Sequence, residues 1–187
     1  MARAKAEGKK MGRKVLDACC GSRMFWFDKQ NPNVEFCDIR EVETTLCDGR
    51  SFEVKPDTIC DFTNLPFPDK SFKLVVFDPP HLLRNTGKSK MADMYGSLNE
   101  KAVPTGYQHI KYGALYDDWK DLIHKGFAEC WRVLDNYGTL IFKWNETDIK
   151  VSEVLKVIGA QPLFGHKSGK ASKTHWMAFM KQEMRVL

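Results

Sequence analysis

The feature that most constrains the fold is an alternation of short apolar segments, typical of strands, with segments that carry turn or helix signals. Five strands are predicted, at residues 14–19, 34–38, 58–62, 72–78 and 139–144. Before the fifth, apolar side chains recur every three or four residues over 115–134, which predicts a helix. Strands alternating with helices favour an α/β fold whose sheet is mostly parallel and doubly wound.

Four shorter elements complete the predicted order. Residues 24–28 are expected to form a short helix, and residues 44–54 a hairpin, because an Asp-Gly pair interrupts an alternating pattern there. Residues 151–158 predict an amphipathic helix ended by a glycine. The segments 163–166 and 176–180 predict a C-terminal antiparallel hairpin.

Length and composition fit one globular domain. The chain has 187 residues, of which 43% are hydrophobic, so a disordered or fibrous chain is excluded. No run of eighteen apolar residues occurs, so no membrane contact is expected. None of the six cysteines forms a CxxC pair, which argues against a metal site and fits a reducing, cytoplasmic location.

The excess of basic over acidic side chains is confined to three segments. Residues 1–14 carry six basic side chains and one acid, residues 82–113 five and two, and residues 162–181 four and none. We expect a basic tail at 1–12 ahead of a domain at 13–187. A loop as long as 82–113 is usually functional, so it is expected to be a substrate-side insertion or lid.

Acidic residues end four successive predicted strands: Asp17, Asp38, Asp61 and Asp78. Ligands of doubly wound sheets bind beyond the carboxyl ends of the strands. Each acid alone is explained equally well as a turn residue or a helix cap. Together they indicate a ligand site, because charges cluster poorly without a partner.

The first turn and the second strand suggest a nucleoside ligand. Gly21 lets a ligand approach the backbone closely, and an acid placed like Asp38 can bind both hydroxyls of a ribose. No G-x-G-x-x-G motif is present, and Arg23 stands where a second glycine would be. A nicotinamide-dependent oxidoreductase is therefore disfavoured.

The segment Asp78-Pro79-Pro80-His81 adds a specific motif. With the acids and Gly21 in this order, residues 13–180 resemble the class I S-adenosylmethionine-dependent methyltransferases that methylate amino nitrogens. Those enzymes carry a D/N-P-P-(Y/F/W/H) motif after the fourth strand. The resemblance implies the class I methyltransferase fold and S-adenosylmethionine as cofactor.

The resemblance also implies a role for each matching position. The methionine part of the cofactor would be held by Asp17, Ala18, Cys19, Cys20 and Gly21, with Arg23 near its carboxylate. Asp38 would bind the ribose, and Asp61 would accept from the adenine amino group. Ile39 and Phe62 would pack on the adenine ring.

The proline motif suits methylation of an amino group on physical grounds. The lone pair of a base amino group is delocalised into the ring, so the nitrogen is a poor nucleophile. If the Asp78 carboxylate and the Pro79 carbonyl each accept one amino hydrogen, the lone pair is aimed at the methyl donor. Pro80 helps to fix the backbone, and His81 would stack on the target base.

A nucleic-acid substrate is expected, because basic segments bind phosphates. No Pro-Cys dipeptide is present, so C5-cytosine methylation is excluded. Adenine N6 is the first candidate and guanine N2 the second. Substrate contacts are expected from Lys88, Lys90, Lys101 and Trp144, with core packing the alternative for Trp144. Two other functions stay open: methylation of a protein glutamine or a small amine, and a catalytically silent nucleic-acid-binding protein of this fold.

Overall fold

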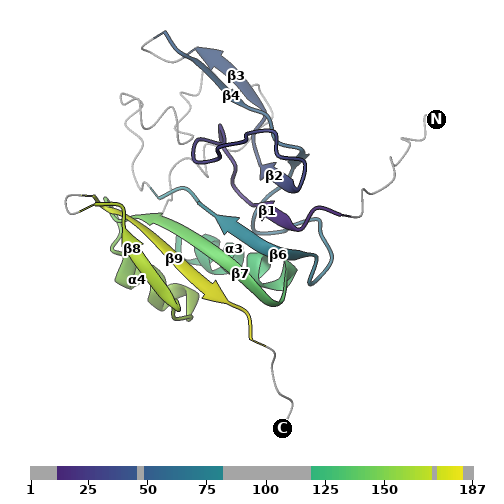
Figure 1. Cartoon of the computed structure of the whole chain (residues 1–187). Helices are drawn as coiled ribbons and strands as arrows, with labels where there is room; N and C mark the ends of the chain where they lie inside the picture. The colour runs from purple at the N-terminus through teal and green to yellow at the C-terminus, as the bar shows by residue number, and fades with distance from the viewer. Residues whose placement is uncertain (1–11, 46–48, 82–118, 170–171, 183–187) are drawn as a thin grey trace.

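The computed structural model describes residues 12–45, 49–81, 119–169 and 172–182. Seven strands form one sheet in the order β5-β2-β1-β6-β7-β9-β8 (Figure 1). These strands are β1 (Val15–Asp17), β2 (Val34–Asp38), β5 (Thr58–Ile59), β6 (Phe72–Phe77), β7 (Leu134–Asn145), β8 (Phe164–Lys167) and β9 (Thr174–Met180).

The first five strands of this sheet are parallel. From β1 the chain winds outward through β2 to β5, then returns to β6 on the other side of β1 and continues to β7. This reversal confirms the predicted doubly wound, mostly parallel sheet. The position between β1 and β6 is therefore the switch point, where such sheets bind ligands.

The predicted C-terminal hairpin is also confirmed. β8 pairs antiparallel with β9, and β9 pairs antiparallel with β7. Thr174, at the start of β9, lies opposite Asn145, at the end of β7. The lysine-rich turn between β8 and β9 therefore lies at the carboxyl edge of the parallel strands, which the sequence alone did not assign.

A second, two-stranded sheet is formed by β3 (Val42–Thr45) and β4 (Ser51–Val54), which pair antiparallel. This is the hairpin predicted over 44–54. Phe52 and Val54 are buried and form a small core with Val42. The hairpin follows β2 at the carboxyl edge of the large sheet and is drawn at the top of Figure 1.

Two helices, α3 (Trp119–Val133) and α4 (Val151–Ile158), pack against the main hydrophobic core. The core side of β7 is its Leu140, Phe142 and Trp144 row, all fully buried. α4 ends as predicted at Gly159, whose φ of 67° is a left-handed conformation that glycine adopts readily.

The opposite face of the sheet carries a turn segment where residues 24–28 were expected to form a helix, so that prediction is wrong. Arg23 has a φ of 55°, and the backbone bonds Arg23 N–H to Cys20 O and Trp26 N–H to Arg23 O close successive turns. Trp26 packs edge-on against Phe36 of β2. The aromatic side chains are thus placed by turns rather than by a helix face.

Two element boundaries also differ from the sequence prediction. α3 runs directly into β7, which begins at Leu134 rather than Thr139, and the register with β6 is irregular between Phe72 and Leu74. β5 covers Thr58–Ile59 and does not extend to residue 62.

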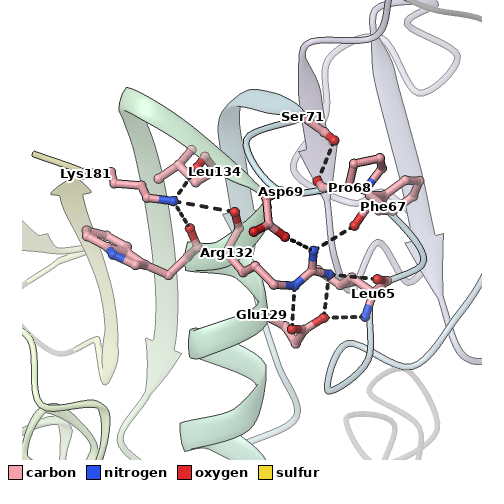
Figure 2. A network of polar contacts seen from close by, with 10 residues as sticks. Leu65, Phe67, Pro68, Asp69, Ser71, Glu129, Arg132, Leu134 and Lys181 are labelled. Atoms are coloured by element: carbon pink, nitrogen blue, oxygen red, sulfur yellow. Dashed lines mark hydrogen bonds and ion pairs between the residues drawn. The ribbon is translucent and has the colours of Figure 1, made fainter. Parts of the chain in front are cut away.

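The C-terminal end of α3 is held by the polar network in Figure 2. Arg132 donates to the carbonyls of Leu65 and Phe67 and pairs with Glu129 and Asp69. The ammonium group of Lys181 donates to main-chain carbonyls at the end of the helix. These contacts fix residues 65–69, in the loop between β5 and β6, against the end of α3.

Candidate active site

A cavity of about 270 Å³ opens at the carboxyl ends of β1, β2 and β6. Ten of its lining residues were predicted as site residues: Ala18, Cys19, Cys20, Gly21, Asp38, Ile39, Phe62, Asp78, Pro79 and Pro80. Five were not: Ser22, Met24, Phe25, Arg40 and Lys143. The structure therefore brings most of the predicted residues to one cavity at the switch point.

The turn after β1 is tied to both neighbouring strands. Ala18 N–H donates to Val76 O at 2.9 Å, and Cys20 N–H to Cys37 O at 2.7 Å. Gly21 has a φ of 48°, which favours glycine. Burial raises the pKa of the Cys20 thiol, so the thiol stays protonated near neutral pH and does not act as a thiolate nucleophile.

Asp38 ends β2 and is only 4% exposed. One carboxylate oxygen, Oδ1, accepts from the backbone N–H of Arg40 at 3.0 Å and from its Nε at 2.9 Å. The other, Oδ2, accepts from Gly21 N–H at 2.9 Å and from Arg40 Nη2 at 3.1 Å. Asp38 therefore joins the glycine turn to Arg40 across the cavity.

Asp78 follows β6 and forms an ion pair with Lys143 of β7. Burial raises the pKa of Asp78, and the Lys143 ammonium opposes that rise. The Lys143 nitrogen also lies 5.7 Å from the ring centroids of both Phe25 and Trp176. The ammonium is thus enclosed by aromatic faces and aimed at the carboxylate.

Asp17 does not line the cavity but lies beneath it, fully buried. Its carboxyl group accepts from Trp26 Nε1 at 2.7 Å and from Cys19 N–H at 3.3 Å. Burial raises the pKa of Asp17 to about 7, against the lowering effect of these two bonds. Its proposed contact with the methionine part of a cofactor stays a prediction.

His81 is 3% exposed and is not among the cavity residues. Its ring lies edge-on to Trp144, with centroids 6.2 Å apart. Burial, reinforced by Lys143, lowers the pKa of His81 to about 4, so the ring is neutral at pH 7. Its stacking on a target base stays a prediction.

The prediction that Trp144 contacts the substrate is wrong. Its side chain is fully buried, and its indole N–H donates to Ile149 O at 3.0 Å. Because no face of the ring is open to solvent, it cannot stack on a substrate base in this conformation. Trp144 is a core residue, which was the alternative interpretation of the sequence.

Two further predicted site residues, Arg23 and Asp61, make their contacts outside the first cavity. Arg23 donates to Lys29 O at 2.5 Å and to Lys55 O at 2.6 Å, and stacks over Phe36 at 3.8 Å. Asp61 Oδ1 accepts from both the backbone N–H and the hydroxyl of Thr63, as in a turn. Neither lines the first cavity, and their cofactor contacts stay predictions.

The predicted substrate lysines Lys88, Lys90 and Lys101, together with the segment 82–113, lie outside the described residues.

A second cavity, of about 730 Å³, adjoins the first and shares Gly21, Ser22 and Met24 with it. It lies between the 21–30 segment and the β3–β4 hairpin. Its charged lining residues are Arg23, Lys29, Arg50, Lys55, Glu53 and Asp57, so basic side chains outnumber acids. Arg23 bonds the two walls together through the carbonyls of Lys29 and Lys55.

The sequence did not predict Arg40 or Lys143 as site residues, although the position of Lys143 in the sequence is unusual. Lys143 is the charged residue of the apolar segment TLIFKW, at a strand end. Alternation along β7 puts it on the face opposite Trp144. Arg40 lies two residues beyond Asp38, and nothing in the pattern distinguishes it from a solvated side chain.

Two kinds of feature are absent from the described residues. They contain no helix long and apolar enough to span a membrane. They also contain no group of three or more histidine, cysteine or acidic side chains arranged to hold a metal ion.

No family model matches the sequence, and no curated protein matches it. Among solved structures, the chain is similar to the PH0226 protein from Pyrococcus horikoshii OT3, with 15% identity over 93% of this chain and 84% of that one, at a TM-score of 0.52. An S-adenosylmethionine-dependent methyltransferase from Leishmania major aligns with 11% identity over 89% of this chain and 63% of its own, at a TM-score of 0.48. At these identities the likeness to PH0226 supports the fold alone.

Proposed function

We propose that this protein is an S-adenosylmethionine-dependent N-methyltransferase acting on an exocyclic amino group of a nucleobase in nucleic acid, adenine N6 first and guanine N2 second. The observation that carries the proposal is the placement of Asp78 and the two prolines after it. They line the same cavity as the Gly21 turn and Asp38.

The cavity fits the proposed cofactor in the type and order of its groups. The backbone turn at Gly21 would hold the methionine part, and the Asp38 carboxylate would accept from the two ribose hydroxyls in place of the Arg40 guanidinium that it now binds. Ile39 and Phe62 offer apolar surface for the adenine ring. When bound, S-adenosylmethionine supplies an electrophilic methyl group.

The chain's own groups would act on the target amino group by positioning it. The Asp78 carboxylate and the Pro79 carbonyl are hydrogen-bond acceptors, and an amino group has two hydrogens to donate. Accepting both favours a pyramidal nitrogen with its lone pair directed away from the acceptors. Lys143 favours the charged, accepting form of Asp78, because its ammonium pairs with that carboxylate inside the cavity.

Lys143 also supports adenine as the first candidate. An ammonium beside Asp78 can donate to an acceptor that flanks the target amino group. Adenine N6 has ring nitrogens on both sides, including the N7 acceptor, whereas guanine N2 has a ring N–H on one side. A donor beside Asp78, the acceptor of an amino hydrogen, can therefore bond to a ring nitrogen of adenine in either orientation of the base.

The second cavity supports nucleic acid as the substrate class. Lys29 and Lys55 are exposed on its two walls, and the cavity adjoins the first, with which it shares Gly21, Ser22 and Met24 as lining residues. Phosphate groups of a bound strand would be neutralised by such side chains.

The mechanism is tested with Asp78→Asn and Asp78→Ala. Both variants should bind S-adenosylhomocysteine in calorimetry nearly as the wild type does, while methyl transfer falls by about 100-fold or more. Products are identified by mass analysis of nucleosides from treated DNA and RNA. Asp28→Asn, an exposed carboxylate outside the cavity, is the control and should keep full activity. Full activity in Asp78→Ala, or methyl groups found in protein instead of nucleosides, would overturn the proposal.

The substrate class is tested with a pair of double variants that change net charge equally. Lys29→Gln with Lys55→Gln should weaken binding of a labelled single strand and reduce its salt slope by about two, one for each phosphate that is no longer neutralised. Lys120→Gln with Lys156→Gln alters exposed lysines on α3 and α4. Equal weakening in the two pairs would indicate a general charge effect and refute this path for the strand.

A further inference from the structure

The carboxylate of Asp38 has no acceptor site left for a ligand. A carboxylate offers about four lone-pair sites, two on each oxygen. All four are filled, by the backbone N–H groups of Gly21 and Arg40 and by two nitrogens of the Arg40 guanidinium. The hydroxyls of a ribose can therefore reach this carboxylate only if another donor leaves.

The Arg40 guanidinium places its two donors as a ribose would. Nε bonds to one oxygen of Asp38 at 2.9 Å and Nη2 to the other at 3.1 Å. A ribose also offers two adjacent donors, its 2′ and 3′ hydroxyls. If the side chain withdrew, one site on each oxygen would open, while the two backbone N–H groups would still hold Asp38 in place.

The position of Arg40 in the cavity leads to the same conclusion. Its Nη2 lies 3.9 Å from the point where a Cβ on Gly21 would stand, so the guanidinium lies against the glycine turn. The cavity of about 270 Å³ is just below the range of about 300 to 1,000 Å³ usual for small-molecule sites. Because Arg40 lines that cavity, its withdrawal would enlarge the space.

We infer that Arg40 is an internal competitor for the ribose subsite: its guanidinium occupies Asp38 in the free protein, and a nucleoside binds by displacing it. The inference rests on the proposed function in taking an S-adenosyl nucleoside as the ligand. The affinity of the wild type is then its intrinsic affinity reduced by the fraction of molecules in which Arg40 has left Asp38.

The test measures binding of S-adenosylhomocysteine by calorimetry to the wild type, Arg40→Ala and Arg40→Gln. Removing the competitor should tighten binding by roughly tenfold to a hundredfold. The same variants should melt at a lower temperature without ligand, because Asp38 loses its cation. Added ligand should raise their melting temperature more than it raises that of the wild type. Lys143→Met removes the other cation among the described residues that line the cavity and should not tighten binding.

A pair of nucleosides tests whether the competition involves the hydroxyls. Arg40→Ala should raise the affinity for adenosine more than the affinity for 2′,3′-dideoxyadenosine, because the second compound has no hydroxyls to replace the missing donors. Equal or weaker binding of S-adenosylhomocysteine in Arg40→Ala, with binding to the wild type intact, would overturn the inference and leave the proposed function standing. No binding by any folded variant would overturn the proposed function, and this inference with it.

Discussion

The buried carboxyl group of Asp17 should make stability depend on pH, and Asp17→Asn should remove that dependence. The pKa of Asp17 is raised from 3.8 to about 7, chiefly by burial. Between these values the folded protein keeps the proton while the unfolded chain has lost it. The folded state therefore binds more protons, and stability falls as pH rises through this window.

The size of the effect follows from the shift. Each pKa unit corresponds to about 1.4 kcal/mol, so a shift of about three units corresponds to about 4 kcal/mol across the window. Asparagine is nearly isosteric and keeps an oxygen that can accept from Trp26 Nε1. Asp17→Asn should thus match the wild type near pH 4 and exceed it by up to about 4 kcal/mol above pH 7.

The assay is urea unfolding followed by tryptophan fluorescence at a series of pH values, comparing the two proteins at each pH. The difference between them isolates Asp17 from other titrating groups. Asp135→Asn is a control of opposite sign, because Lys73 lowers the pKa of Asp135. That variant should be less stable than the wild type near neutral pH and should approach it at low pH. A stability difference for Asp17→Asn that is constant from pH 4 to pH 8 would refute the reasoning.

Three further outcomes are expected. Gly126→Ala should destabilise the protein by about 1–3 kcal/mol in urea unfolding, since its Cβ would lie 2.5 Å from Phe62. Lys181→Met should lower the melting temperature, because carbonyls at the end of α3 lose their donor, whereas Lys181→Arg should retain part of the stability. Lys143→Met should move the acid limb of the pH–rate profile to higher pH, since its ammonium opposes the rise in the pKa of Asp78; Lys143→Arg should restore the profile.

The sequence predicted the placement of Asp38 and Asp78 because that placement depends on general rules. The carboxyl ends of parallel strands meet at one edge of the sheet, and the winding from β1 in both directions puts the ends of β2 and β6 on either side of the same turn. The two acids therefore line one cavity. The predicted hairpins rest on similarly local signals.

The contacts of Arg40 and Lys143 depend on register and side-chain conformation, which a pattern does not contain. Phe77 pairs with Phe142 across β6 and β7, and this register is what puts Asp78 next to Lys143. The helix predicted at residues 24–28 is absent for a related reason, because a turn at Arg23 takes its place. Its left-handed backbone is stabilised by bonds to carbonyls at Lys29 and Lys55, which no helix propensity takes into account.

Three strand-end acids share one small region, and the protein's own groups accommodate their charges. Asp17 is buried with a raised pKa and is largely protonated below neutral pH. Asp38 and Asp78 are paired with cations that line the cavity, Arg40 and Lys143. A ligand that uses either carboxylate must therefore exchange with or share an internal partner. The free energy of binding then depends on the hydrogen bonds gained and on the ion pair given up, so substitution of Arg40 should alter the affinity for a nucleoside, and substitution of Lys143 the pH dependence of the rate.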